Sequence, residues 1–416
     1  MQRRWWVMIA VSLFFAFQTA ATFSSFGIVL YAMAADFGWS NAAAGMSFSL
    51  LGLACGLAST VPVWLMARVG TRLTMVSGAA MMVAGALLAC FAQGLVPFYI
   101  AAMLLGMGFT LGGNVPCMYL LASWFPERSA RMIGIYLMVG ALGGMLAPPL
   151  VQAVLELADW QTHWILIAVA GSLVGSFGLL TIRDAPEASV PAGASATGEA
   201  ASEPGWSAPA AQRTPHFVLV VSAYVLMTLG ATTMHSSAMP HLVNLDVTRM
   251  AAAVLLSLVA LASAFAKGAG AWVCEAIGAQ RLLIGTLLCS AGGLMALSVA
   301  SSQPVGYLFA VLFGLGWGGT YLATHVLLIE WFGRRPSAKL LALMHLWNTV
   351  ATVGPLAAGM MADALGSFAG IFWIYAGLAL ALAAVLLWLG APGEGDVAAT
   401  PPLVPPIDEP ELKEAL

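Results

Sequence analysis

The chain has 416 residues, of which 61% are hydrophobic and only 8% are charged. A soluble globular domain carries roughly 25% charged residues, so this chain could not cover its surface as a soluble protein. A water-soluble enzyme is therefore excluded, and an integral membrane protein is expected. The formal net charge of -3 provides no basic surface, so no nucleic-acid partner is expected.

Twelve apolar segments are long enough to span a bilayer, which takes about 20 residues of helix. They lie at 5–34, 42–66, 73–93, 97–122, 131–157, 162–182, 215–241, 251–273, 281–300, 304–329, 339–362 and 368–390. The first is too long for the core of a signal peptide and a second span follows at once, so it is expected to be retained. The predicted fold class is an all-α membrane protein.

Two further stretches are predicted to lie outside the membrane. Residues 184–214 are rich in Ala, Ser, Pro, Gly and Glu and cannot bury an apolar face, which predicts a flexible cytoplasmic linker. Residues 391–416 are Pro-rich and acidic, which predicts a disordered tail. The linker divides the spans into a first half at 1–183 and a second half at 215–390.

Basic residues gather on one side of the predicted membrane, as is typical of cytoplasmic loops. Of the 15 basic residues, all but Arg249 and Lys267 fall on the side of the N-terminus. They are Arg3, Arg4, Arg68, Arg72, Arg128, Arg131, Arg183, Arg213, Arg281, Arg334, Arg335, Lys339 and Lys413. Both ends are therefore predicted to be cytoplasmic, and the Ala- and Gly-rich composition favours a bacterial inner membrane.

No cofactor or metal is expected. The five cysteines lie in apolar stretches without CxxC spacing, which favours packing over disulfide or metal roles. No phosphate-binding loop GxxxxGK[ST] is present, so ATP is not the expected energy source. The chain is expected to act as a monomer.

The two halves repeat each other at a shift of about 207 residues. The matches are Tyr99, Gly106 and Gly108 with Tyr307, Gly314 and Gly316; Trp124, Phe125 and Arg128 with Trp331, Phe332 and Arg335; Gly70 with Gly278; and Pro148 with Pro355. Chance similarity of Gly-rich helices explains isolated glycines but not the two Trp-Phe pairs. Two parallel six-helix halves around a central site are typical of rocking transporters.

The turn after the second span carries a recognisable signature. It holds Arg68, Gly70 and Arg72, and its counterpart in the second half holds Glu275, Gly278 and Arg281. This resembles the loop motif GxLxDRxGRR of the major facilitator superfamily, although Ala67 stands where the family has Asp. The resemblance implies twelve helices, alternating access, and charge pairs that latch the cytoplasmic side. The missing Asp removes one partner of that latch in the first half.

Short motifs resemble one branch of that superfamily, the oxalate/formate antiporters and monocarboxylate transporters. They are the runs 36–40 (Asp-Phe-Gly-Trp-Ser), 124–128 (Trp-Phe-Pro-Glu-Arg) and 261–267 (Leu-Ala-Ser-Ala-Phe-Ala-Lys). In that branch the residue at the position of Lys267 is usually Arg and binds the substrate carboxylate. The resemblance implies the same role for Lys267. Relatives with a buried acid one turn earlier differ, because this chain has Ser263 there.

Lys267 lies deep in its predicted span, where an ionisable residue costs about 2.5–3.5 kcal/mol to insert. Its ammonium could snorkel to the cytoplasmic headgroups. A cavity-facing cation for an anionic substrate is the interpretation that the resemblance favours. Substrate binding is further predicted for His345, whose position often carries a second cation in the branch, and for Asn348, three residues on.

Other polar residues inside the spans are candidates for the same site. His325 shares a helix face with Tyr321, and His235 shares one with Thr228 and Thr232. Histidines in helices are often packing residues, so both interpretations remain open. His163 and His241 lie near the outer ends of spans and are expected to be solvated.

The first half has no charge inside its spans. Its predicted substrate-binding residues are Asn114 and Tyr119, of which Tyr119 could instead pack between helices. The hydroxyl groups of Thr19, Thr22 and Ser24 are expected to join helices rather than bind substrate.

Charged residues at matching cytoplasmic positions are predicted to form ion pairs that close an inner gate. They could equally be a solvated rim. The gating candidates are Arg68, Arg72, Arg128, Glu275, Arg281, Glu330 and Arg335.

The leading hypothesis is secondary transport of a small organic anion, a monocarboxylate, with proton symport. Histidine titrates near pH 6.5, so His325 or His345 could carry the proton, and Lys267 is the competing carrier. Exchange of anions stays open as an alternative to symport. So do an exporter of drugs or another metabolite and a transporter-like membrane sensor. The expected partners are the anion, protons or a counter-anion, and the bilayer.

Overall fold

The computed structural model describes residues 2–184 and 206–389, and every regular element in these ranges is a helix. The α-helices are α1 (Gln2–Thr19), α2 (Phe26–Phe37), α3 (Asn41–Leu57), α4 (Val61–Cys90), α5 (Leu95–Gly112), α6 (Asn114–Trp124), α7 (Ser129–Leu157), α8 (Trp160–Thr181), α9 (Ala208–Gln212), α10 (Pro215–Asn244), α11 (Arg249–Ile277), α12 (Ala279–Ser298), α13 (Gln303–Phe332), α14 (Arg334–Trp347), α15 (Gly354–Leu365) and α16 (Ala369–Leu389). A π-helix, η1 (Ala20–Ser24), and two 3-10 helices, η2 (Pro126–Arg128) and η3 (Asn348–Val353), complete them.

Eleven helices in the described ranges are long and apolar enough to cross a membrane, and Asn41–Leu57 is a shorter apolar helix. The span predicted at 42–66 is divided between α3 and the start of α4. The expected loop after it is absent, because Gly70 (φ 83, ψ 165) turns the chain inside α4 by itself. A positive φ is accessible to glycine without steric cost, so one residue suffices.

Three predicted spans are interrupted rather than continuous. η1 separates α1 from α2, Gly113 separates α5 from α6, and η3 separates α14 from α15. Pro355 accounts for the last break, since proline donates no backbone hydrogen bond and its ring crowds the preceding turn. Breaks of this kind are tolerated in a membrane only where the backbone lies against protein or a cavity.

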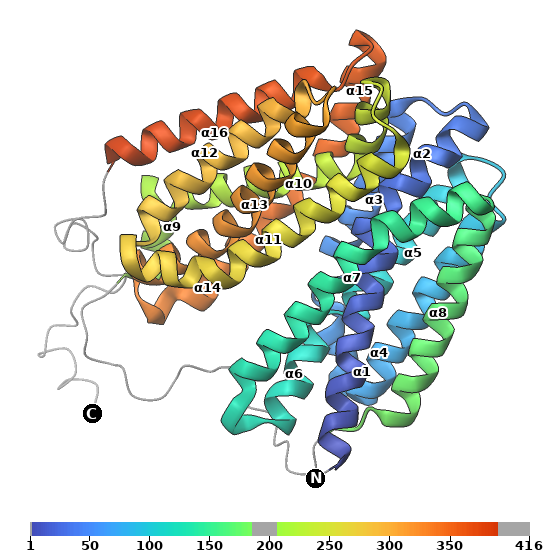
Figure 1. Cartoon of the computed structure of the whole chain (residues 1–416). Helices are drawn as coiled ribbons and strands as arrows, with labels where there is room; N and C mark the ends of the chain where they lie inside the picture. Colours follow the sequence, from blue (N-terminus) through green and yellow to red (C-terminus); the bar gives the residue numbers. More distant parts are fainter. Residues whose placement is uncertain (1, 185–205, 390–416) are drawn as a thin grey trace, which may run out of the picture.

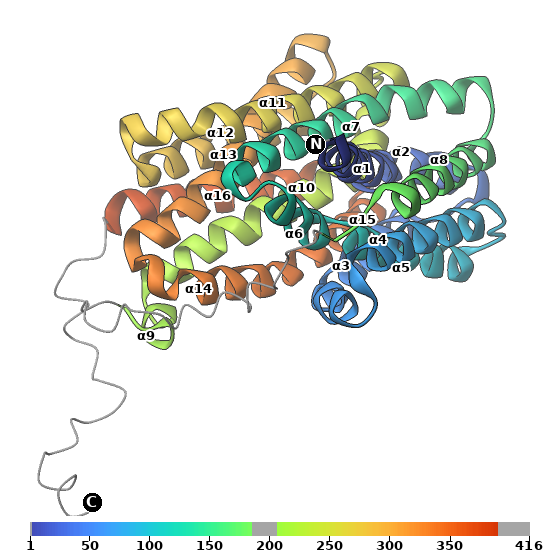
Figure 2. The same ribbon diagram turned by 90° about the horizontal axis from the view of Figure 1, so that it is seen from below.

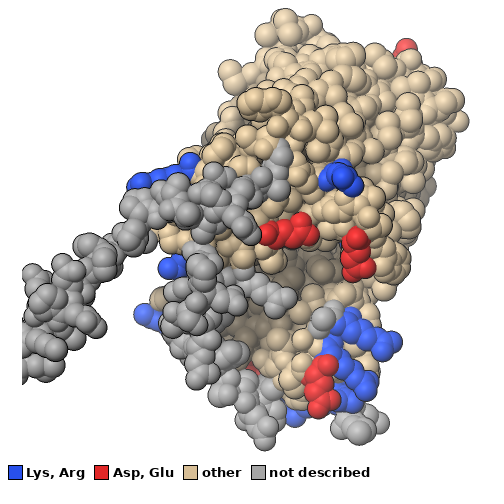
Figure 3. All heavy atoms as spheres, turned by 90° about the vertical axis from the view of Figure 1, so that its left-hand side faces the viewer, with Lys and Arg blue, Asp and Glu red and all other residues tan. Residues whose placement is uncertain are grey.

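The two sets of helices form separate bundles (Figures 1 and 2). They meet around α2, α3, α10 and α15 and diverge toward the ends of α6 and α14 (Figure 1). A space-filling view shows a hollow between the bundles, with charged side chains around it (Figure 3). The hollow opens on the side that the basic residues predict to be cytoplasmic.

The glycines of the internal repeat pack alike in both bundles. Gly106 lies against the carbonyl of Leu51, and Gly314 lies against that of Val259, so each residue of the second contact comes 208 positions after its counterpart. Gly108 and Gly316 likewise lie against Met82 and Ser290. At each contact a Cβ would collide with a neighbouring helix, which explains why these positions are glycine.

The end of the predicted linker departs from the expectation of flexibility. Residues 206–214 hold α9, which packs against α14, and the ring of Trp206 lies 5.6 Å from that of Phe332. Trp206 and Ala211 are buried, so these residues belong to the second bundle. The residues 185–205 and the tail predicted at 391–416 lie outside the described part of the chain.

Candidate functional site

The ammonium of Lys267 lies over two aromatic rings of α13. Its Nζ is 4.9 Å from the ring centroid of Trp317 and 5.2 Å from that of Tyr321, both within cation–π range. No acidic side chain in the described ranges forms an ion pair with it. The structure therefore presents a cation whose negative neighbours are ring faces rather than a carboxylate.

A chain of rings continues from Tyr321 across three helices. The His325 ring lies 4.4 Å from that of Tyr321, and both His325 and His345 pack near Tyr224 at 5.5 and 5.3 Å. The two histidine rings are 5.5 Å apart. Tyr224 Oη and His345 Nδ1 are hydrogen-bonded at 3.2 Å. His325 Nδ1 donates to the carbonyl of Tyr321 at 2.7 Å, which leaves Nε2 of both histidines outside these bonds.

At the other end of Lys267, Trp317 contacts His235. Their ring centroids are 5.3 Å apart, and His235 Nδ1 bonds to the Ala231 carbonyl at 2.7 Å. The carbonyl of His235 touches Gly27 of α2 so closely that no Cβ would fit. His235 thus lies where the second bundle meets the first.

These residues form one cluster on the inner wall of the second bundle. Lys267, Tyr321 and His345 keep exposed surface although helices α10, α11, α13 and α14 surround them. A lipid-facing side chain would contact only its own helix and its immediate neighbours. Convergence from four helices makes this exposed surface the candidate lining of the hollow between the bundles, which the space-filling view shows (Figure 3).

The break in the eleventh span lies beside this cluster. Helix α14 ends at Trp347, two residues after His345, and Asn348 begins η3. The Oδ1 atom of Asn348 is buried and has no hydrogen-bond partner among the described residues. Asn348 lies three residues after His345 where the α-helix passes into a 3-10 turn, and its backbone stays helical (φ -61, ψ -18).

The first-half candidates lie on a different wall. Asn114 Oδ1 accepts a 2.9 Å hydrogen bond from Tyr136 Oη, and Tyr136 stacks on Phe15 at 4.6 Å. Tyr119 is half-buried against the apolar cluster that includes Phe14 and Leu120. Their helix, α6, packs on α1, α4, α5 and α7, all of the first bundle.

Sequence reasoning missed three aromatic members of these walls: Tyr224, Trp317 and Tyr136. The spacing of Trp317, Tyr321 and His325 at intervals of four residues on one helix face could have revealed Trp317. No sequence signal exists for Tyr224 or Tyr136, because their contacts come from other helices.

Two expectations about histidines are corrected. His163 and His241 are 3% and 2% exposed, not solvated. His241 Nε2 bonds to the Leu297 carbonyl at 3.0 Å, and the His163 ring packs on Trp164 at 5.2 Å. A helix end near the membrane surface can still be covered by neighbouring helices.

The inner-gate candidates lie apart in this conformation. No ion pair joins Arg68, Arg72, Arg128, Arg281, Glu275 or Glu330 to an opposite charge among the described side chains, and the side chain of Arg335 lies outside them. The guanidinium of Arg68 lies 4.2 Å over the Trp64 ring instead. Charges on the two bundles are separated here by the hollow (Figure 3).

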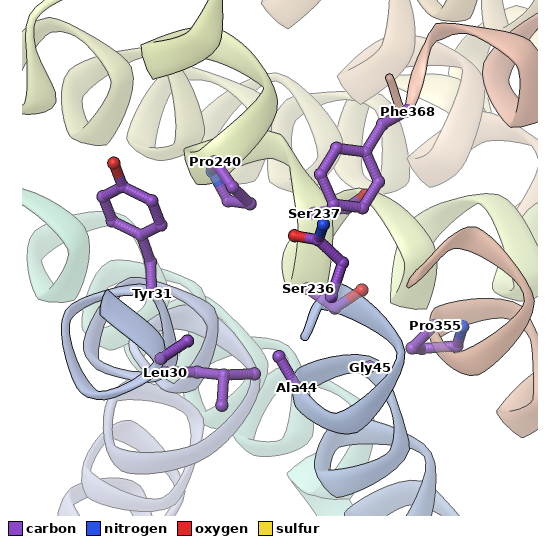
Figure 4. A pocket seen from close by; sticks show the side chains of 11 residues that line it. Leu30, Tyr31, Ala44, Gly45, Ser236, Ser237, Pro240, Pro355 and Phe368 are labelled. Carbon is purple, nitrogen blue, oxygen red and sulfur yellow. The ribbon is translucent and has the colours of Figure 1, made fainter. Parts of the chain in front are cut away.

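The opposite end of the molecule is closed by contacts between the bundles. Asp363 of α15 accepts 2.9 Å bonds from the backbone N–H groups of Asn41 and Ala42 in α3. Ser49 of α3 accepts a 3.2 Å bond from the N–H of Leu356 in α15. A small cavity of about 30 Å³ lies beside these contacts, between Tyr31 and Ala44 of the first bundle and Ser237 and Phe368 of the second (Figure 4).

Comparison with known proteins identifies a family and two relatives of similar sequence. The model of the Major Facilitator Superfamily matches residues 9–232 and 220–413. Monocarboxylate transporter 13 of Bos taurus is 26% identical over 400 residues, which cover 92% of this chain and 89% of that protein. Monocarboxylate transporter 13 of Rattus norvegicus is 25% identical over 401 residues, with the same coverage.

Solved structures share the fold. The nucleoside transporter NupG superposes with a TM-score of 0.77 at 12% identity, over 92% of this chain and 99% of its own in a mutant form. An inward-facing, unoccupied bacterial homologue of the human lysosomal transporter Spinster has a TM-score of 0.72 at 15% identity, over 94% and 96%. At these identities the likeness establishes the arrangement of helices alone.

Proposed function

The chain belongs to the major facilitator superfamily and is a multi-pass membrane transporter, and from this we propose that it carries a small monocarboxylate by alternating access. The observation that carries the proposal is Lys267, a cation that lies over the rings of Trp317 and Tyr321 and has no ion-pair partner in the described ranges. We assign this cation to the wall of the hollow between the two bundles. The similarity to proteins named monocarboxylate transporter 13 supports the same substrate class.

One positive charge selects for one negative charge. A carboxylate about 4 Å from the Lys267 ammonium gains roughly 4 kcal/mol at an effective dielectric constant of 20. With neutral histidines this wall neutralises a single carboxylate and leaves a second one unpaired. A monocarboxylate is therefore the best match.

Proton symport is the coupling that the cluster supports best. His325 donates its Nδ1 proton to the Tyr321 carbonyl, so its Nε2 is available to take a proton near the bound anion. His345 shares its Nδ1 with the Tyr224 hydroxyl, and whichever of its ring nitrogens is unprotonated can take the proton there. Lys267 is the competing proton carrier. A proton that travels with a monocarboxylate makes the cycle electroneutral.

The hollow between the bundles supports an inward-facing state (Figure 3), and the Spinster homologue of similar fold is described as inward-facing. We propose a bacterial inner membrane, which the Ala- and Gly-rich composition favours. Both termini are proposed to be cytoplasmic, because the basic residues gather on that side. The residues proposed to close that side in the alternate state are the inner-gate candidates.

Uptake into proteoliposomes tests the transport proposal. Purified protein should accumulate labelled lactate or phenylacetate when an inward proton gradient is imposed, and protein-free vesicles should not. No flux of any monocarboxylate would overturn the proposal and favour a sensor or an exporter of other compounds. Flux that ignores the proton gradient and requires an internal anion would replace symport by exchange.

The identity of the proton carrier needs His325→Gln and His345→Gln. If the gradient drives uptake in the unmodified protein and either variant loses the dependence, that histidine is the carrier. If both variants respond normally, Lys267 is left in that role.

A further inference from the structure

We propose that the substrate is an aryl monocarboxylate, in which the carboxylate group is attached to a flat aromatic ring. This inference rests on the proposed function. The proposal follows from what surrounds the cation. A carboxylate that reaches Lys267 Nζ comes beside the two rings that the ammonium already contacts, Trp317 and Tyr321.

The wall next to the ammonium offers ring faces. Tyr321 is 38% exposed, and its ring continues into that of His325 at 4.4 Å. Several polar atoms of the cluster are already engaged: Tyr224 Oη with His345 Nδ1, and His325 Nδ1 with a backbone carbonyl.

A flat ring fits this surface better than an aliphatic ring of equal size. Offset and edge-to-face aromatic pairs form at centroid distances of 4.5–7 Å and add stabilisation beyond the burial of apolar area. The rings of the wall keep this spacing among themselves, with centroids 6.1 Å apart for Tyr224 and Tyr321. A substrate ring can extend the same series.

The test compares phenylacetate with cyclohexylacetate as competitors of labelled phenylacetate uptake. These acids match in charge and size and differ in planarity. We expect phenylacetate to compete about three- to tenfold better. Tyr321→Leu should remove the preference, Tyr321→Phe should keep it, and Tyr307→Leu, at an exposed tyrosine of the same helix, should leave it unchanged.

The outcomes separate this inference from the proposed function. If both acids compete equally in the unmodified protein, or if Tyr321→Leu keeps the preference, the aryl inference is wrong while carboxylate transport stands. If neither acid nor lactate is transported, the proposed function itself fails.

A second inference rests on the closed outer end. We infer that Asp363 and Ser49 are positioning residues that hold the outer gate shut through reciprocal helix capping. Asp363 of α15 satisfies the first N–H groups of α3, and its Oδ1 also accepts a 2.9 Å bond from Asn41 Nδ2. Ser49 of α3 satisfies an N–H in the first turn of α15.

Each helix end therefore receives hydrogen bonds from the opposite bundle, which at α3 add to the cap that Ser40 provides by accepting from the Ala43 N–H. The first N–H groups of a helix have no partner within the helix, and a carboxylate there is stabilised by the helix dipole. Close packing accompanies the caps: Gly45 touches the carbonyl of Pro355, and Gly359 touches that of Asn41. Opening the outer side must break these bonds together, which stabilises the closed outer gate.

Cysteine labelling tests the latch. Ser237→Cys lies at the small outer cavity (Figure 4) and should react slowly with a membrane-impermeant maleimide from outside. Adding Asp363→Ala should raise the labelling rate severalfold and Asp363→Asn less, since Asn keeps one acceptor. Asp246→Asn is the control at another outer-end acid.

The proportion of monodisperse protein shows whether each variant is folded. Unchanged labelling in folded Asp363→Ala would overturn the latch. If Asp363→Ala does not fold, Asp363→Asn decides, and no increase there would overturn it as well.

Discussion

Helix α13 of the second bundle and the α5–α6 segment of the first are repeat counterparts with opposite chemistry. α13 runs unbroken from Gln303 to Phe332, whereas its counterpart breaks at Gly113. At the 208-residue shift of the packed glycines, Trp317, Tyr321 and His325 correspond to Phe109, Gly113 and Cys117. Lys267 corresponds to Ser59, in the turn between α3 and α4.

The comparison separates what the repeat keeps from what it changes. The glycine contacts that hold neighbouring helices together are the same in both bundles. The wall residues have diverged: in the second bundle the cation of Lys267 lies over two ring faces, whereas Ser59 stands at its counterpart position in the first bundle. The fold is thus symmetric while the proposed anion site belongs to one half.

Of the changes that test this difference between the two bundles, removal of the cation should reduce uptake the most. We expect Lys267→Ala to reduce monocarboxylate uptake by about 100-fold or more, since it loses most of a roughly 4 kcal/mol attraction. Lys267→Arg should retain part of the activity because its guanidinium also binds carboxylates. Lys339→Ala, at an exposed lysine of α14, is the control and should transport normally. Normal uptake by Lys267→Ala would refute the proposal that the anion site lies in the second bundle.

Moving the charge to the other wall should not restore transport. In the double variant Lys267→Ser with Ser59→Lys, the cation lies at the repeat-equivalent position, in the turn at the end of α3. At that position the residues that correspond to Trp317 and Tyr321 are Phe109 and Gly113. Uptake should stay at the level of Lys267→Ser alone. Recovery to more than half of the unmodified rate would mean that either wall can serve.

A smaller effect is expected from Tyr224, which orients His345. Tyr224→Phe removes a hydrogen bond, a change of about 1 kcal/mol, so uptake should fall roughly fivefold and its pH profile should shift. Tyr375→Phe, at a buried tyrosine bonded to Thr233 at 3.4 Å, serves as the control and should keep the profile. An unshifted profile in Tyr224→Phe would separate His345 from proton coupling.

The smallest effect is expected on the first wall. Tyr136→Phe removes the bond to Asn114 but leaves the stack on Phe15, so uptake should change less than about twofold. A loss as large as that of Tyr224→Phe would show that the first wall takes an equal part. The measurement is the ratio of the uptake rates of Tyr136→Phe and Tyr224→Phe, with both variants assayed in vesicles prepared in the same way.

The fold was largely predictable because the spans follow from long apolar segments and the repeat from residues that match at a fixed shift in sequence. Long apolar segments and repeated glycines identify the helices and the two bundles. The interruptions at Gly113 and Asn348 were missed, since hydropathy does not register backbone breaks. Gly70 was expected in a loop, but its positive φ makes the turn within α4.

The candidate site was predictable only in its ionisable members. Lys267, His325 and His345 stand out because charge or titratable groups are rare inside spans. The neutral rings of Trp317 and Tyr224 do not stand out in a sequence rich in aromatic residues. Their roles depend on contacts between helices that are distant in sequence, which only the structure reveals.

The most direct test of the central claim is calorimetric titration of the purified protein with phenylacetate and with its uncharged amide, phenylacetamide. The two ligands share one shape and differ in the carboxylate. If Lys267 holds that group, the acid should bind at least about tenfold more tightly than the amide. In Lys267→Ala both should bind with equal, weak affinity. A preference for the acid that survives Lys267→Ala would contradict the assignment of the anion site to Lys267.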